Sequence, residues 1–132
     1  MKRYMLDTNM VSHLIKGNAH TIRQVIALQM KSLCISVITE AEMLFSLAKH
    51  PTATRLHIAV REMLRRIDVL TWDSIVAERY GLIRANMEQK GIILAPLDLL
   101  IATHALSVGA ILVTNDKAFS QVANLIVEDW TV

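Results

Sequence analysis

Short apolar runs alternate with amphipathic segments along the whole chain of 132 residues. Apolar runs that lack strict alternation are typical of strands covered by helices on both faces. They predict strands at 4–6, 33–38, 69–72, 110–114 and 125–127, with 69–72 as an edge strand. Between them, apolar residues recur at helical intervals and predict helices at 9–16, 20–30, 39–49, 52–67, 74–91, 99–107 and 116–122. This order predicts one α/β domain over residues 1–132, with a mostly parallel sheet flanked by helices on both faces.

Polar residues next to these segments predict where helices begin and end. Asn9 follows the first strand and is expected to cap the next helix. Thr39 and Glu42 have the spacing of a capping box at the start of the third helix. Asp73 is expected to cap the long helix that follows the edge strand, and Gly109 to end the apolar helix before the fourth strand.

The composition indicates a chain with much apolar surface to bury. Apolar residues make up 53% and charged residues 20%, which fits a two-sided sheet or a surface hidden against a partner. The single Cys34 forms no internal disulfide, and no leader-like segment precedes the first strand, so a cytoplasmic location is expected. The weakly charged stretch 91–113 is not expected to span a membrane, because Pro96, Asp98 and His104 lie within it.

Four acidic residues fall where a parallel sheet would bring them to one edge. Asp7 ends the first strand, Glu42 follows the second, and Asp116 follows the fourth. Asp98 begins the helix that leads into the fourth strand. Ligands of such sheets bind beyond the carboxyl ends of the strands, and four carboxylates there would repel one another unless a cation bound. Oxygen ligands favour Mg²⁺ or Mn²⁺, whose chemistry in such sites is phosphodiester cleavage by metal-activated water.

The remaining charge is basic. The chain has 14 Lys and Arg against 12 Asp and Glu, so without the four clustered acids eight acids oppose 14 bases. Candidates for RNA phosphate contacts lie mostly off the apolar stripe of the helix at 52–67, and they are Arg55, Arg61, Arg65 and Arg66. The histidines have no zinc-ligand spacing, and His104 is expected to be a hydrogen-bonded core or interface residue.

An ordered set of motifs resembles the PIN-domain ribonucleases of the VapC toxin family. The motifs are Met5-Leu6-Asp7-Thr8-Asn9, Ser36-Val37-Ile38-Thr39-Glu40-Ala41-Glu42, Pro96-Leu97-Asp98 with Ile101-Ala102-Thr103-His104-Ala105, Val113-Thr114-Asn115-Asp116 with Phe119, and Val127-Glu128-Asp129-Trp130. The resemblance implies a PIN-like fold with a five-stranded parallel sheet. It also implies a metal-dependent endoribonuclease toxin of a toxin–antitoxin pair.

The family's site residues carry over one by one. The resemblance assigns metal binding and catalysis to Asp7, Glu42, Asp98 and Asp116, and the hydrogen bonds that orient them to Thr8, Asn9, Ser36 and Thr114. Two positions depart from the pattern: Ser46 stands where many relatives have Gly, and Ala118 where many have a further acid. The fourth ligand therefore depends on Asp116 alone.

The resemblance also implies partners. It implies a homodimer, and a small VapB-type antitoxin whose tail covers the acidic groove in a hetero-oligomer. Structured RNA is the implied substrate, commonly the anticodon stem-loop of initiator tRNA and in other members ribosomal RNA.

Other functions fit single features of the sequence. Asp7, Glu42 and Asp116, taken one at a time, also suit simple helix caps. A phosphotransferase or phosphatase would use Asp7 as a covalent nucleophile, but it would want an acid at the position of Asn9. A non-catalytic PIN-fold binding module would keep the fold without the chemistry, which the presence of all four acids disfavours.

Overall fold

The computed structural model of the chain describes residues 2–132 and is built on a five-stranded sheet whose neighbouring strands are all parallel. The strands are β1 (Tyr4–Leu6), β2 (Leu33–Ser36), β3 (Asp68–Leu70), β4 (Ile111–Val113) and β5 (Val127–Glu128). Their order across the sheet is β3-β2-β1-β4-β5, so β1 is central and β3 lies at an edge. The α/β fold with a parallel sheet, expected from the apolar pattern, is confirmed.

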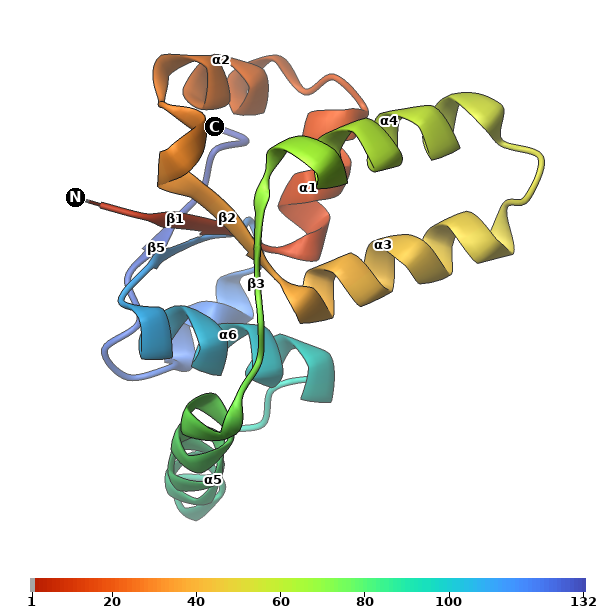
Figure 1. Ribbon diagram of the computed structural model, residues 1–132. Coiled ribbons are helices and arrows are strands. Elements are labelled where there is room, and N and C mark those ends of the chain that lie inside the picture. Colours follow the sequence, from red (N-terminus) through yellow and green to blue (C-terminus); the bar gives the residue numbers. More distant parts are fainter. Residues whose placement is uncertain (1) are drawn as a thin grey trace.

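Helices cover both faces of this sheet (Figure 1). They are α1 (Thr8–Ile15), α2 (Ala19–Ala27), α3 (Val37–Lys49), α4 (Thr54–Arg66), α5 (Ser74–Gln89) and α6 (Pro96–Val108), with 3₁₀ turns at Met30–Ser32 and Lys117–Gln121. In Figure 1, α3 and α4 form an antiparallel hairpin that projects from the sheet, and α5 packs against α6 on the opposite side. Among residues 2–132, every helix is too short or too polar to cross a bilayer.

Alternating side chains of the central strands enter two separate cores. Leu6 and Ile35 point to the face covered by α1, α3 and α4, together with Met10 and Val60. Met5, Cys34 and Leu112 point to the other face, against α5 and α6. Burial on both faces explains why these strands are continuous apolar runs.

Two of the expected helix caps are wrong. Asp7, not Asn9, caps α1, because its Oδ1 accepts a hydrogen bond from the Met10 N–H at 2.8 Å. Ser36, not Thr39, caps α3, with its hydroxyl accepting from the Ile38 N–H at 3.1 Å. The helix therefore begins inside the apolar run 33–38, and β2 ends at Ser36, because an apolar run alone does not separate a buried strand from the first turn of a buried helix.

The other predicted boundaries lie closer to the observed ones. Asp73 caps α5 by accepting from the Val76 N–H, and Gly109 ends α6 in a left-handed conformation with φ 68°. The expected helix 20–30 ends at Ala27 and is followed by a 3₁₀ turn. The expected helix 116–122 is a 3₁₀ turn, capped by Asp116.

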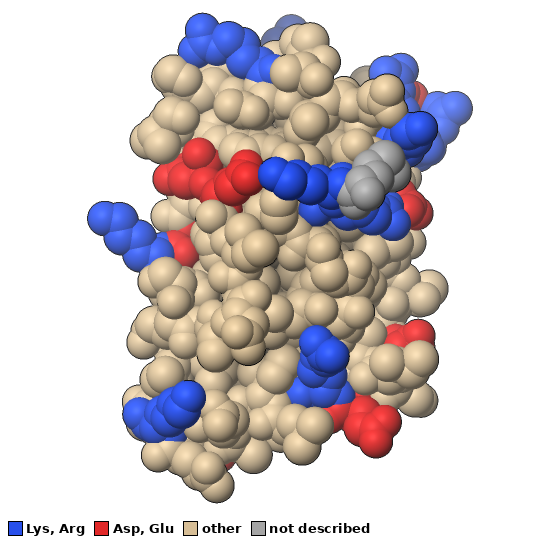
Figure 2. Space-filling view, turned by 90° about the vertical axis from the view of Figure 1, so that its left-hand side faces the viewer, with Lys and Arg blue, Asp and Glu red and all other residues tan. Residues whose placement is uncertain are grey.

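Large apolar side chains also remain on the surface. Phe45 and Ile58 on the α3–α4 hairpin are 62% and 60% exposed, and Ile75 and Leu82 on α5 are 74% and 73% exposed. Figure 2 shows one face of the molecule, on which a row of acidic and basic side chains crosses the upper half and residues other than Lys, Arg, Asp and Glu cover most of the rest. The sheet alone thus does not hide the apolar surface of this chain.

Candidate active site

Asp7 lies at the carboxyl end of the central strand, where the chain turns from β1 into α1. Its backbone N–H continues the sheet by donating to the Val113 carbonyl at 3.0 Å, and its side chain caps the helix through Met10. These contacts fix the carboxylate between β4 on one side and α1 on the other. Of the other acids, Glu42 lies in α3 and Asp98 in α6, both helices being labelled in Figure 1, and Asp116 follows β4.

The Asp7 carboxylate is buried and electrostatically strained. The residue is 3% exposed, and burial raises its pKa from 3.8 to about 6. The Met10 N–H and the Thr114 hydroxyl face the carboxylate and lower its pKa, while the negative charges of Asp98 and Asp116 raise it. A metal-free Asp7 is therefore held in a site that disfavours its own charge.

Asp98 and Glu42 also interact electrostatically with the other acids of the cluster. Asp98 lies in the first turn of α6, half-buried, and its pKa is raised by burial and by the charges of Asp116 and Glu42. Glu42 lies in α3, where the Thr8 hydroxyl donates a hydrogen bond to its Oε1. The charges of Asp98 and Asp116 thus act on Asp7, and those of Asp116 and Glu42 act on Asp98.

Thr114 joins two of these acids at the end of β4. Its hydroxyl faces Asp7 and accepts a hydrogen bond from the Asp116 N–H at 3.0 Å. Asp116 in turn caps the following 3₁₀ turn, with its Oδ1 accepting from the Ala118 N–H at 2.9 Å. Asp116 thus has one oxygen engaged as a cap, in a hollow that also includes Asn115.

The donor set suits a hard divalent cation. It consists of four carboxylates and two neighbouring hydroxyls, without Cys or His, which favours Mg²⁺ or Mn²⁺ over zinc. Within residues 2–132, no three acidic, His or Cys side chains already stand at the spacing of metal ligands. The four carboxylates are therefore not already gathered around a common point in this structure.

Two residues expected to orient the carboxylates lie elsewhere. Asn9 is exposed, and no hydrogen bond joins its side chain to the four acids in the part of the chain that the structure describes. Ser36 is fully buried and contacts His104 rather than an acid, at 2.7 Å between Oγ and Nδ1. His104 is thus a hydrogen-bonded core residue, as expected from the sequence.

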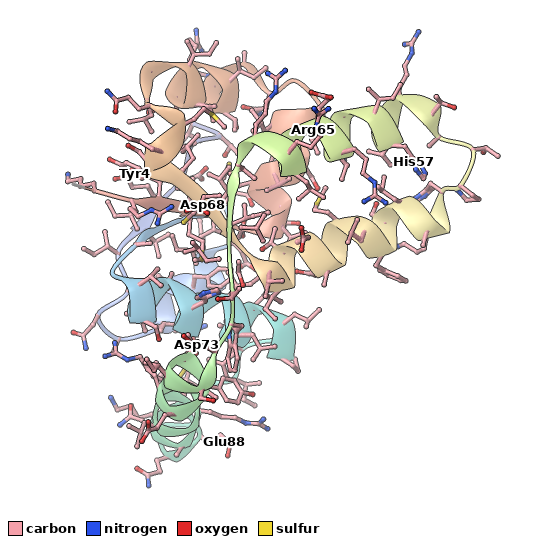
Figure 3. The ribbon with its side chains drawn as sticks, in the orientation of Figure 1. Tyr4, His57, Arg65, Asp68, Asp73 and Glu88 are labelled. Carbon is pink, nitrogen blue, oxygen red and sulfur yellow. The ribbon has the colours of Figure 1, made fainter. Side chains whose placement is uncertain are left out.

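The four predicted RNA-binding arginines all lie on α4, next to the acid-bearing α3. Arg65 and Arg66, near the end of the helix, are both paired with Glu62, at 2.8 and 3.4 Å (Figure 3 labels Arg65). Arg55 and Arg61 are exposed, and neither forms an ion pair with another of residues 2–132. Of the four, Arg55 and Arg61 are thus the two whose charge is not offset by an acid among the described residues.

One contact at the site has no signal in the sequence. His13, in the last turn of α1, lies 3.1 Å from Asn115, measured between Nε2 and Nδ2. The two residues are 102 positions apart, and neither falls in a spacing that indicates contact. This pair connects α1 to the loop that carries Asp116.

Over nearly its whole length the chain is similar to known proteins. The PIN domain family matches residues 4–125. The chain is 36% identical over 132 residues to the tRNA(fMet)-specific endonuclease VapC of Shigella flexneri, covering 99% of this chain and all of the relative. It is 34% identical over 130 residues to ribonuclease VapC2 of Rickettsia felis, covering 96% and 97% of the two chains. Among solved structures, DNA-bound VapBC from Salmonella typhimurium superposes with a TM-score of 0.90 at 36% identity, covering 98% of this chain and 99% of the other.

Proposed function

Because this chain belongs to the VapC family of PIN-domain proteins, we propose that it is a metal-dependent endoribonuclease and the toxin of a toxin–antitoxin pair. The observation that carries the proposal is the cluster of Asp7, Glu42, Asp98 and Asp116 at the carboxyl ends of parallel strands, where the buried Asp7 has a pKa raised to about 6. Burial is the main cause of this raised pKa, and the charges of Asp98 and Asp116 add to it. A bound cation would offset both effects, which gives the cluster a role beyond capping helices.

The four carboxylates would hold Mg²⁺ or Mn²⁺. When bound, the ion supplies a water of lowered pKa and neutralises charge that develops on the scissile phosphate. Thr8 orients Glu42, and Thr114 orients both Asp7 and the backbone of Asp116. These hydroxyls keep the carboxylates in place before the substrate arrives, which is how neighbouring hydrogen bonds support a metal site.

Water, rather than Asp7, is the attacking group in this proposal. Asp7 is almost inaccessible, and one of its oxygens already accepts from the Met10 N–H. A covalent nucleophile needs an exposed, in-line oxygen, and the phosphotransferase chemistry would also want an acid at the exposed Asn9. The structure thus offers no specific support for that alternative, nor for a binding module without chemistry.

We further propose structured RNA, and tRNA in particular, as the substrate. Relatives named for tRNA(fMet) match nearly all of this chain, which makes the anticodon stem-loop of initiator tRNA the first RNA to test. Arg55 and Arg61 would contact phosphates and position the RNA without reading its bases. The reaction would take place in the cytoplasm, where that RNA is found.

A VapB-type antitoxin and a second copy of the chain are the proposed protein partners. Solved relatives are VapBC complexes, from Rickettsia felis at a TM-score of 0.87 and 33% identity and from Salmonella typhimurium. Phe45, Ile58, Ile75 and Leu82 lie exposed on two different sides of the fold, so more than one apolar contact is available. A homodimer within a toxin–antitoxin hetero-oligomer would cover such surfaces.

The test is cleavage of initiator tRNA and of an unrelated structured RNA by the purified chain. Cleavage should require Mg²⁺ or Mn²⁺, stop with EDTA, and be lost in Asp98→Asn. Asp73→Asn is the matched control, because it makes the same change at an exposed helix cap that is not one of the four acids (Figure 3). Cleavage that survives both EDTA and Asp98→Asn would refute the metal-dependent mechanism.

A further inference from the structure

Ser36 and His104 form a buried polar contact between the two helices that carry Glu42 and Asp98. Both residues are fully buried, and Ser36 Oγ lies 2.7 Å from His104 Nδ1. Ser36 ends β2 and caps α3, while His104 lies in the middle of α6, 68 positions along the chain. The contact is the hydrogen bond that ties the start of α3 to α6.

The hydrogen-bonding roles follow from the neighbours. Ser36 Oγ already accepts from the Ile38 N–H, so its proton is free to be donated to His104 Nδ1. Burial lowers the pKa of His104, which favours the neutral ring that this donation requires, although Thr71 and Asp73 act in the opposite direction. A neutral ring with Nδ1 as acceptor carries its own hydrogen on Nε2, which is buried.

Each partner of the contact is six positions along the chain from one of the site carboxylates. Glu42 is six residues after Ser36 on α3, and Asp98 is six residues before His104 on α6. Six residues of helix correspond to about 9 Å, so a small rotation of either helix about the contact moves its carboxylate. We infer that Ser36 and His104 are positioning residues, whose hydrogen bond fixes α3 against α6 so that Glu42 and Asp98 face the same ion. The inference rests on the proposed ribonuclease function.

The buried groups around the Ser36–His104 hydrogen bond indicate that it positions the helices rather than stabilises the fold. Within residues 2–132, Thr39 Oγ1 on α3 and Thr103 Oγ1 on α6 are buried without a hydrogen-bond partner, whereas the ring of His104 also faces the Thr71 backbone. Unsatisfied polar groups cost free energy, and apolar residues of the same shape would serve stability better. A polar contact kept among such groups is better explained by the arrangement that it imposes.

Three variants separate positioning from stability. His104→Leu puts an apolar side chain of similar size in place of the imidazole and removes the hydrogen bond. His104→Asn places an amide where Nδ1 was. Thr103→Val is the matched control, because it removes a neighbouring buried hydroxyl that has no partner among the described residues. The measurements are the single-turnover rate of RNA cleavage, Mn²⁺ affinity, and the melting temperature without metal.

His104→Leu should lower the cleavage rate and the Mn²⁺ affinity by 10- to 100-fold, roughly the effect of removing a group that orients metal ligands. Its melting temperature should stay within about 4 °C of the parent. His104→Asn should recover most of the rate, and Thr103→Val should cleave like the parent. A His104→Leu protein that cleaves like the parent, or a loss of rate matched by Thr103→Val, would overturn the inference.

Ser36→Ala supplies a second test from the other partner of the hydrogen bond. It removes this hydrogen bond together with the cap that accepts from the Ile38 N–H, and by itself it should lower the cleavage rate and the Mn²⁺ affinity as His104→Leu does. Where both single variants fold, Ser36→Ala combined with His104→Leu should lose little more rate than the worse single variant. Losses that multiply would overturn the inference. If the parent itself shows no metal-dependent cleavage, the proposed function fails; if the parent cleaves and the variants match it, only the positioning role fails.

Discussion

Replacing Asp7 by Asn should stabilise the metal-free protein at neutral pH. Asp7 is 3% exposed and its pKa in the folded protein is about 6, against 3.8 as its ordinary value. Well below pH 3.8 the group is neutral in both the folded and the unfolded chain, so it costs no stability. Between pH 3.8 and 6 the unfolded chain gives up this proton while the folded protein keeps it, so the free energy of unfolding falls as the pH rises, and above pH 6 the loss is complete.

The size of the effect follows from the two pKa values. Each pKa unit corresponds to about 1.4 kcal/mol, so the difference costs the folded protein about 3 kcal/mol at pH 8 and about half as much at pH 5. Asn can still accept the Met10 N–H, so the helix cap is kept. Asp7→Asn should therefore raise the free energy of unfolding by about 3 kcal/mol at pH 8, or the melting temperature by roughly 10 °C.

Urea unfolding at pH 5 and pH 8, in EDTA, measures this difference. Asp73→Asn is the matched control, since Asp73 also caps a helix with its Oδ1 but is exposed, and the change there should stay within about 0.5 kcal/mol. Added Mg²⁺ should stabilise the parent and leave Asp7→Asn unaffected. Equal stability of parent and Asp7→Asn at pH 8, or a difference that grows toward pH 5, would refute the claim that burial raises the pKa of Asp7 and destabilises the folded protein.

Three further predictions concern the surroundings of Asp7. Thr114→Val removes a hydroxyl that lowers the pKa of Asp7, so the acid limb of the pH–rate profile of RNA cleavage should move to higher pH. An unmoved profile would mean that the hydroxyl does not act on Asp7. Thr8→Val frees Glu42 and should weaken Mn²⁺ binding by 10- to 100-fold in a direct titration, while leaving the melting temperature in EDTA nearly unchanged. Arg61→Glu should weaken RNA binding by the metal-free protein and flatten its dependence on salt concentration. If the affinity of Arg61→Glu for RNA depends on salt concentration as steeply as that of the parent, Arg61 does not contact the RNA.

Much of the fold was predictable because the sequence features that indicate strands and helix ends involve residues only a few positions apart. The apolar runs of β1, β2 and β4 reflect burial on both faces, and Asp73 and Gly109 mark the ends of helices through local backbone chemistry. Local signals also explain the errors. The spacing of Thr39 and Glu42 suits a capping box, but Ser36 caps the helix and Thr8 hydrogen-bonds Glu42.

The candidate site was predictable only in part, for the same reason. The four acids could be grouped because each follows or precedes a recognisable element, and parallel strands bring those ends together. The contacts of His104 with Ser36 and of His13 with Asn115 connect residues 68 and 102 positions apart. No periodicity or spacing encodes them, because they arise only when the helices have packed.

The central place of β1 also determines when the sheet and the proposed site can form during synthesis of the chain. β1 is made first, yet its partners β2 and β4 lie at Leu33–Ser36 and Ile111–Val113, and Asp116 comes later still. Pairing strands so distant in sequence is slow, because the chain between them must be closed into a loop first. A ribosome that has not yet released the last part of the chain therefore carries a protein without its fourth carboxylate. The proposed site is therefore completed late, after most of the chain has left the ribosome.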